Sequence, residues 1–223
     1  IYLPTDKLLK EAKLGRFHNG LVELIYNYGK YLLISSSRKG SSGCNLQGIW
    51  NKDLKAAWSS NYTTNINTEM NYWGMSQCNL SECAEPFVRM VDEIMQHGKT
   101  TAHTNYNCDG FACNHNVDIW RKTAPVKGES EYMFAPLFGV WLANELYEHL
   151  RYGDMEKYRD KVQTITTEAA KFACDYLILR KGEYITCPST SPEASFIKDG
   201  KKCSVDYASA FDLGLIRQVF DNY

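Results

Sequence analysis

Polar side chains with hydrogen-bonding capacity cluster in one short stretch of the chain, residues 58–73. Asn65, Asn67, Glu69 and Asn71 follow one another at alternate positions there. Asparagine is a poor helix former because its side chain competes for backbone hydrogen bonds. Capping a helix start accounts for one of the three Asn residues but not for all of them. Some other interaction is therefore expected to use these side chains.

A single carboxylate stands in a second polar segment, Cys187–Glu193. Prolines at both ends restrain the segment, and Glu193 lies among hydroxyl groups with the apolar Ile185 and Phe196 nearby in the sequence. A carboxyl group in such surroundings suits a proton donor. The competing interpretation is a solvated surface charge, which is the ordinary role of a glutamate in a loop.

Two further segments offer amide, imidazole and aromatic groups. Asn45, Gln47 and Trp50 supply two amides and an aromatic ring, which suit the binding of hydroxyl groups or the hydrogen bonding of the loop's own backbone. His115 lies in the segment Cys113–Trp120, where a structural role is the ordinary one for a lone histidine.

Composition limits the class of protein. The 223 residues are 44% hydrophobic, which suffices for a core. The 25 basic and 26 acidic side chains are mixed along the chain, so nothing favours nucleic acid or an anionic membrane as partner. No apolar run is long enough to span a bilayer. The 15 Tyr and 5 Trp fit a normal core and also fit a sugar site, since sugar rings stack on aromatic faces.

The eight cysteines include no Cys-x-x-Cys pair, which argues against a zinc ribbon or a thioredoxin-type site. Cys108, Cys113 and His115 form a conceivable metal-binding group, but their spacing fits no common template. Free buried thiols are the favoured interpretation. The even number of cysteines leaves disulfides open as well.

Helical periodicity dominates the chain, with apolar residues recurring at spacings of three and four. The expected helices are 17–37, 81–104, 131–152, 155–180 and 207–223. The polar, irregular segments between them are 35–61, 105–128 and 182–204, with a possible short hairpin near 183–187. This alternation predicts an all-α toroid of paired helices with its long polar loops gathered at one end.

In order and over nearly the whole chain, these segments resemble glycoside hydrolase family 95, the inverting α-L-fucosidases. The strings that carry the resemblance are Tyr28–Arg38, Asn45–Trp50, Tyr62–Trp73, Asn79–Cys83, His115–Trp120, Thr123–Val126 and Pro188–Glu193. The family implies an (α/α)6 barrel, a six-hairpin helical barrel of which about half is expected here. Residues 1–16 would lead into it as a linker and residues 17–223 would form its first part, in a chain that reads as cut at both ends.

The resemblance implies hydrolysis of terminal α-L-fucose, of the 1,2-linked type, from a fucosylated oligosaccharide with inversion. Glu193 would be the general acid, and Asn67, assisted by Asn65, would hold the attacking water. In the family an Asp well downstream of the acid supports the amides. Asp206 and Asp212 follow Glu193 too closely to match it, so this partner is expected beyond residue 223 and the isolated chain is expected to be inactive.

The resemblance also places further residues around the sugar and implies no metal or organic cofactor. These substrate-binding residues are Thr63, His115, Asp118, Trp120 and Trp73.

Two positions depart from the family pattern. Ala194 stands where the family commonly has Asn, which removes a polar neighbour of Glu193. Thr63 stands where fucosidases of the family can carry His, and the smaller side chain leaves space for a 6-hydroxyl group. An α-L-galactosidase acting on an L-galactosylated oligosaccharide is therefore an alternative. A non-catalytic carbohydrate-binding fragment is another, whereas a purely structural scaffold has no reason to place amides at a helix start.

Overall fold

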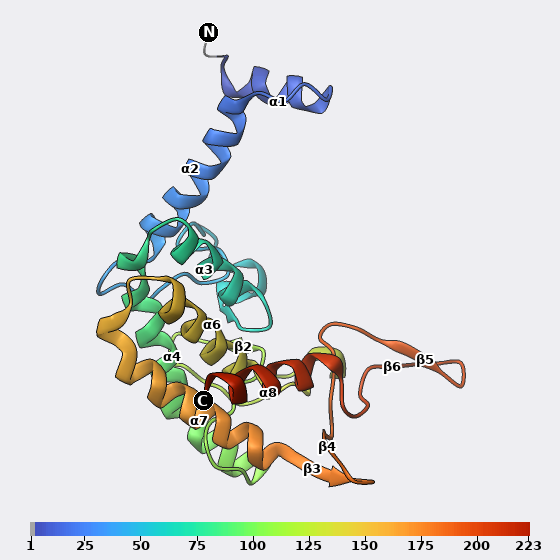
Figure 1. The fold of residues 1–223 in the computed structure, drawn as a ribbon. Coiled ribbons are helices and arrows are strands. Elements are labelled where there is room, and N and C mark those ends of the chain that lie inside the picture. The colour runs from blue at the N-terminus through green and yellow to red at the C-terminus, as the bar shows by residue number, and fades with distance from the viewer. Residues whose placement is uncertain (1–2) are drawn as a thin grey trace.

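The computed structural model describes residues 3–223, which fold into helices with three short antiparallel strand pairs (Figure 1). The α-helices are α1 (Thr5–Lys13), α2 (Asn19–Ser36), α3 (Asn67–Gln77), α4 (Ala84–Thr101), α5 (Ser130–Met133), α6 (Phe138–Tyr152), α7 (Arg159–Tyr176) and α8 (Ala210–Asn222). Short helical turns are η1 (Ala57–Ser60), η2 (Ser81–Cys83), η3 (Ala102–Tyr106) and η4 (Glu156–Tyr158). The strands are β1 (Tyr62–Thr63), β2 (Asn116–Val117), β3 (Leu177–Arg180), β4 (Glu183–Thr186), β5 (Phe196–Lys198) and β6 (Lys201–Cys203).

The predicted all-α class is confirmed, and α2, α4 and α8 lie within the predicted ranges. The prediction of one helix over 131–152 is wrong. The chain forms the short α5, breaks at residues 134–137 and resumes as α6. Pro136 lies in the break, where it lacks an N–H donor and its ring obstructs the preceding turn. The carbonyl of Pro136 instead accepts the N–H of Cys113 at 3.2 Å.

The predicted helix over 155–180 is too long at both ends. Its first part forms η4, and α7 ends at Tyr176, after which Leu177–Arg180 extends as β3. Ile178 and Leu179 pair with Ile185 and Tyr184 of β4, which confirms the hairpin expected near 183–187. β-branched and aromatic partners favour this cross-strand pairing over continued helix. The β5–β6 hairpin was not predicted.

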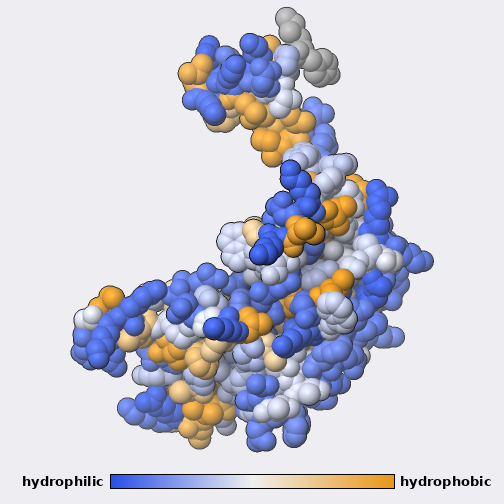
Figure 2. All heavy atoms as spheres, turned by 180° about the vertical axis from the view of Figure 1, so that it is seen from behind, coloured by the Kyte–Doolittle hydropathy of each residue, from blue (hydrophilic) through white to orange (hydrophobic). Residues whose placement is uncertain are grey.

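The core lies around α6, which packs against α3, α4, α7 and α8. The largest fully buried side chains come from these helices and the loop after α4, and they include Tyr72, Phe87, Phe111, Phe138 and Phe172. By contrast, α1 has no buried residue, and the arm of α1 and α2 extends away from the packed helices in Figure 1. Figure 2 shows apolar side chains on the surface of this arm. The assignment of residues 1–16 as a linker stays a prediction, and residues 1 and 2 lie outside the described part of the chain.

No helix within residues 3–223 combines the length and the apolar character needed to cross a lipid bilayer.

Gly98 allows the loop after α4 to cross close against that helix. A Cβ atom at Gly98 would meet the carbonyl oxygen of Ala112 at 2.7 Å and Cβ of Phe111 at 3.0 Å. We expect Gly98→Ala to lower the free energy of unfolding by about 1–3 kcal/mol, because backbone and a buried ring must move. Gly29→Ala on α2 is the matched control, since no atom lies within 4 Å of its Cβ position. Urea unfolding should show the control gaining roughly 1 kcal/mol; equal effects would contradict the steric argument.

Candidate active site

A two-residue ladder brings the Asn-rich segment and the His115 segment together. Tyr62 and Thr63 of β1 pair antiparallel with Val117 and Asn116 of β2. Beyond the ladder, Thr64 donates its N–H to the carbonyl of His115 at 2.9 Å. The short pairing therefore fixes Thr63 and the following amides beside residues from a loop some fifty positions later.

The start of α3 presents Asn65 and Asn67 and buries the carboxyl of Glu69. Asn67 is the first residue of the helix, while Asn65 lies two positions before it and is half-buried. Glu69 is fully buried, and neither carboxyl oxygen has a hydrogen-bond partner among the described residues. Burial raises the pKa of Glu69 well above its ordinary value. Glu69 is therefore a core residue, whereas the two asparagines remain at the surface of the helix end.

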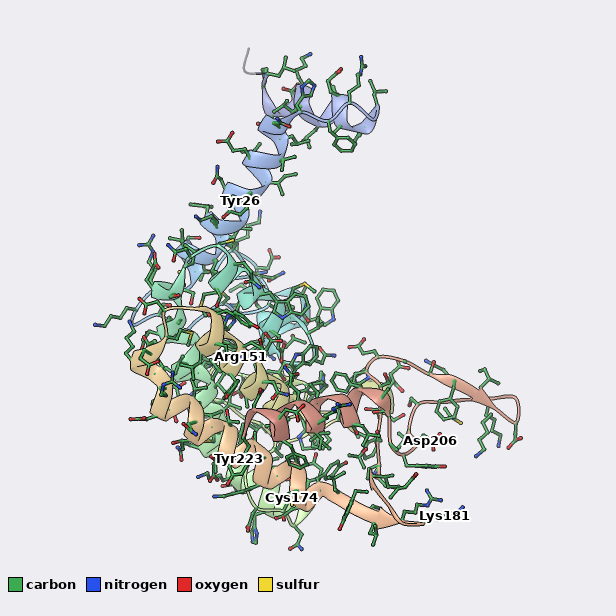
Figure 3. All side chains as sticks on the ribbon, in the orientation of Figure 1. Tyr26, Arg151, Cys174, Lys181, Asp206 and Tyr223 are labelled. Atoms are coloured by element: carbon green, nitrogen blue, oxygen red, sulfur yellow. The ribbon has the colours of Figure 1, made fainter. Side chains whose placement is uncertain are left out.

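Glu193 is carried by a loop that is buried at its base. Ser189 and Thr190 are almost fully buried. The backbone of Ser189 pairs with that of Asp206, each N–H donating to the other's carbonyl at 2.9 Å. Asp206 is labelled in Figure 3 on the segment between the β5–β6 hairpin and α8. From this buried base the chain reaches Glu193, whose side chain is exposed.

Glu193 and Asn65 meet although they are 128 positions apart in the sequence. Nδ2 of Asn65 donates a hydrogen bond to Oε1 of Glu193 at 2.9 Å. Both residues line a cavity of about 1020 Å³ together with Thr63, Asn67 and His115. This volume is large enough for a sugar and part of its neighbour. The structure thus gathers five of the eight predicted site residues around one opening.

His115 lines this cavity as a nearly buried, neutral imidazole. Its ring packs against Tyr132 with centroids 4.9 Å apart, and its Nδ1 has no hydrogen-bond partner among the described residues. Burial lowers the pKa of His115, while the nearby Glu193 carboxylate opposes that shift. A neutral imidazole offers one donor and one acceptor. His115 is therefore equipped to bind a hydroxyl group.

Trp73, Asp118 and Trp120 are not among the described residues that line the cavity. The indole N–H of Trp73 donates to Glu145 at 3.3 Å, beside a separate depression on α3 and α6. Asp118 closes its own turn by accepting the N–H groups of Trp120 and Lys122 at 2.9 and 3.0 Å. The side chain of Trp120 is 78% exposed. A substrate role for these three residues stays a prediction.

Several cavity residues were not singled out from the sequence. Trp141 of α6 and Phe211 of α8 follow the helical apolar pattern, which gave no reason to separate them from the core, and their rings contact edge to face at 5.4 Å. Tyr132 lies in the short helix α5 and Lys127 lies just before it, and no sequence motif marks either residue.

Asn45 satisfies its own loop, because its Oδ1 accepts from Gln47 N and Ser60 Oγ at 2.9 and 3.0 Å.

The cysteines carry no metal site in the part of the chain that the structure describes. All eight are free thiols, but only Cys44, Cys83, Cys108 and Cys113 are buried as favoured from the sequence, whereas Cys78 and Cys203 are half-buried and Cys174 and Cys187 are exposed. No group of three or more His, Cys, Asp or Glu side chains within residues 3–223 is arranged to hold a metal ion, so Cys108, Cys113 and His115 do not form one.

Asp212, behind the Glu193 loop, links stability to pH. Burial raises the pKa of Asp212 to about 6, an effect limited by the hydrogen bond from Ser189 and by the nearby Thr186 hydroxyl. Between pH 4 and 6 the folded protein therefore binds more protons at Asp212 than the unfolded chain does, and this group's contribution to stability falls as pH rises. The total change is up to roughly 3 kcal/mol.

Asp212→Asn should remove that dependence. We expect the difference in unfolding free energy, variant minus wild type, to grow in favour of the variant as pH rises from 4 to 6 and to stay constant above 7. Chemical unfolding at five or six pH values measures this difference. A difference that does not vary with pH would show that Asp212 titrates normally in the folded protein.

A carboxyl group, amides and aromatic rings around one cavity suit the binding of a small polar ligand and proton transfer to it. Residues 2–223 match the model of the glycosyl hydrolase family 95 catalytic domain. Because the match covers nearly all of its residues, the chain belongs to glycosyl hydrolase family 95.

Curated relatives support the same family. The chain is 41% identical over 203 residues to "Alpha-L-fucosidase 2" of Arabidopsis thaliana, a match that covers 90% of this chain and 24% of that protein. It is 33% identical over 177 residues to "Probable alpha-fucosidase A" of Aspergillus niger, covering 76% of this chain and 22% of that protein. The chain thus spans about a quarter of the length of these relatives.

Proposed function

We propose that the chain forms the acid side of the active site of an inverting exo-glycosidase that removes terminal α-1,2-linked L-fucose from oligosaccharides. The observation that carries the proposal is the 2.9 Å contact between Asn65 and Glu193 inside the cavity. Family membership and relatives named as alpha-fucosidases support L-fucose as the sugar that is removed. A chain with an unrelated function would have no reason to hold Asn65 and Glu193 together at one cavity.

Glu193 is proposed as the general acid. Among the described residues that line the cavity it is the only carboxylate, and its exposed side chain can reach a bound sugar. When the bond between the anomeric carbon and the leaving oxygen breaks, the leaving oxygen takes the proton of Glu193. Glu193 accepts a hydrogen bond from Asn65 at 2.9 Å, and as the acid it is proposed to turn from that contact toward the leaving oxygen.

Asn65 and Asn67 are proposed to hold the water that attacks the anomeric carbon from the opposite face. The water oxygen forms the new bond while the water gives up one proton. An amide is too weak a base to take that proton alone, so a carboxylate must stand behind it. Asp212 does not qualify, because it is buried behind the Glu193 loop and bonded to Ser189. Among the described residues that line the cavity Glu193 is the only carboxylate, so the second carboxylate is proposed to come from outside these 223 residues.

Two measurements test the proposal. One is the anomer of the sugar that is released first, and the other is the turnover of the 223 residues alone compared with that of the natural polypeptide. The natural polypeptide carrying these residues should release L-fucose from an α-1,2-fucosylated oligosaccharide, with the β-anomer as the first product seen by NMR. The 223 residues expressed alone should bind the sugar but turn it over at least a hundredfold more slowly. Release of the α-anomer would refute inversion, and comparable turnover by the short chain would refute the need for an outside carboxylate.

Thr63 favours α-L-galactosides as a second candidate substrate. Thr63 lines the cavity, and because its side chain is smaller than the His that fucosidases of the family can carry, it is proposed to leave space for the hydroxyl by which L-galactose exceeds L-fucose. We expect Thr63→His to lower the ratio of kcat/KM for L-galactoside over L-fucoside by roughly ten- to a hundredfold. Matched aryl glycosides of the two sugars measure the ratio. An unchanged ratio would remove Thr63 from the specificity site.

A further inference from the structure

The cap of α8 contains a side chain from the Glu193 loop. Ser209 is the residue before α8, and its Oγ accepts the N–H of Asp212 at 3.2 Å. In an ordinary capping box the acidic side chain would in turn accept the N–H of the cap residue. Here Ser209 N donates to Ser189 Oγ at 3.0 Å, and Ser189 Oγ donates to Asp212 Oδ2 at 2.7 Å. The hydroxyl of Ser189 is therefore inserted between the two halves of the capping box.

A second hydrogen bond ties the same loop to the same cap. Ser209 Oγ donates to the carbonyl of Thr190 at 2.9 Å. Thr190 Oγ1 donates in addition to the carbonyl of Phe134 at 3.3 Å. Ser189 and Thr190 are 1% and 2% exposed, so water does not compete for these groups. The base of the loop is thus fixed to the first turn of α8.

The fixed base determines where Glu193 points. Glu193 follows Thr190 by only three positions, and it lies within a turn in which Ala194 N donates to the carbonyl of Ser191 at 2.6 Å. At its tip Glu193 contacts Asn65 across the cavity. A shift at Ser189 or Thr190 is therefore transmitted to the acid over a very short length of chain.

We propose that Asp212 is a positioning residue for Glu193, which it directs into the cavity by holding Ser189 within the cap of α8. This inference rests on the proposed function, in which Glu193 is the general acid. Asp212 is not among the described residues that line the cavity, so it acts through the loop and does not touch the substrate. An acid that only capped the helix would have no bond to Ser189.

The first test follows the Asn65–Glu193 contact and does not depend on activity. The natural polypeptide carrying these residues is labelled with ¹⁵N at asparagine, and the side-chain amide signals of Asn65 are recorded. Asp212→Ala and Ser189→Ala should shift these signals, although neither residue contacts Asn65. Asp212→Asn, which keeps an acceptor, should leave them in place, as should Asp221→Ala at the exposed far end of α8. Unmoved signals in folded Asp212→Ala or Ser189→Ala would overturn the proposal; if Asp212→Ala does not fold, Ser189→Ala decides.

The second test measures hydrolysis. Asp212→Ala and Ser189→Ala should lower kcat roughly ten- to a hundredfold with KM unchanged, because a misplaced acid affects proton transfer and not sugar binding. Asp212→Asn, which keeps an acceptor, should retain most of the wild-type kcat. Shifted Asn65 signals with unchanged kcat would overturn the positioning role. If the wild type releases no sugar, the proposed function fails, and the Asn65 signals alone then decide whether Asp212 sets the direction of Glu193.

Discussion

Glu193→Gln should lower kcat/KM about 10²- to 10⁴-fold for a fucosylated oligosaccharide in the natural polypeptide. Glutamine keeps the shape of the side chain and can still accept the hydrogen bond from Asn65, but it has no proton to give to the leaving oxygen. An aryl fucoside with a very acidic phenol needs little protonation, so its loss should be much smaller. Steady-state rates for the two substrates measure this contrast.

Glu183→Gln is the matched control, since Glu183 is an exposed glutamate on the nearby β3–β4 hairpin and not a cavity residue. It should retain full activity on both substrates. Equal losses for the two leaving groups in Glu193→Gln would show that Glu193 does not act as the acid. Glu193→Gln that binds sugar normally, together with a wild type that never turns it over, is the result expected of a carbohydrate-binding fragment.

Asn67→Ala should lower kcat/KM about 10²- to 10³-fold while stability stays constant or rises by less than about 1 kcal/mol. The activity loss follows from a misplaced water. The stability result follows from the local structure, because the Asn67 side chain has no hydrogen bond to another described residue and alanine is a better helix former. Enzyme kinetics and urea unfolding of one preparation give both values.

Asn71→Ala separates this effect from a general loss of polar side chains. Asn71 lies one turn further along α3, where its Nδ2 donates to the carbonyl of Asn45 at 3.0 Å. Its removal should cost about 1 kcal/mol of stability and affect turnover far less than Asn67→Ala. The opposite ranking, a stability loss at Asn67 and an activity loss at Asn71, would contradict the assignment of Asn67 to the water.

The helices α2, α4, α6, α7 and α8 were predictable because their apolar spacing is regular, whereas α1 and α3 were not among the predicted helices and the helix ends were not predictable. Periodicity continued through Pro136, yet the segment around it leaves the helix to pair with the loop at Cys113. Leu177–Arg180 fits a helical pattern as well as a strand pattern, and only its partner β4 decides between them. Tertiary pairing of this kind is not visible in one local stretch of sequence.

The site was predictable where polar side chains stood in places that a core cannot use. The polar pattern singled out Asn65, Asn67 and Glu193, the family resemblance supplied their expected roles, and the structure places all three at one cavity. Glu69, in the same alternating series, is instead fully buried, because a helix turns every second residue to a different face. Trp141 and Phe211 were missed for the converse reason, since apolar rings at helical spacing look alike whether they face the core or a cavity.

The β5–β6 hairpin begins three residues after Glu193, and its return strand is fastened beside the cavity. Lys202 forms an ion pair with Glu131 at 2.9 Å, and Ser204 shares a hydrogen bond with Ser130 at 2.6 Å, on the same α5 that supplies Tyr132 to the cavity lining. The hairpin tip is free of these contacts and exposed to solvent. Lengthening or shortening the tip would therefore change this exposed surface while the residues that line the cavity keep their places. Exposed hairpin tips of this kind tolerate insertions and deletions, so the length of this one can vary without disturbing the packing beneath it.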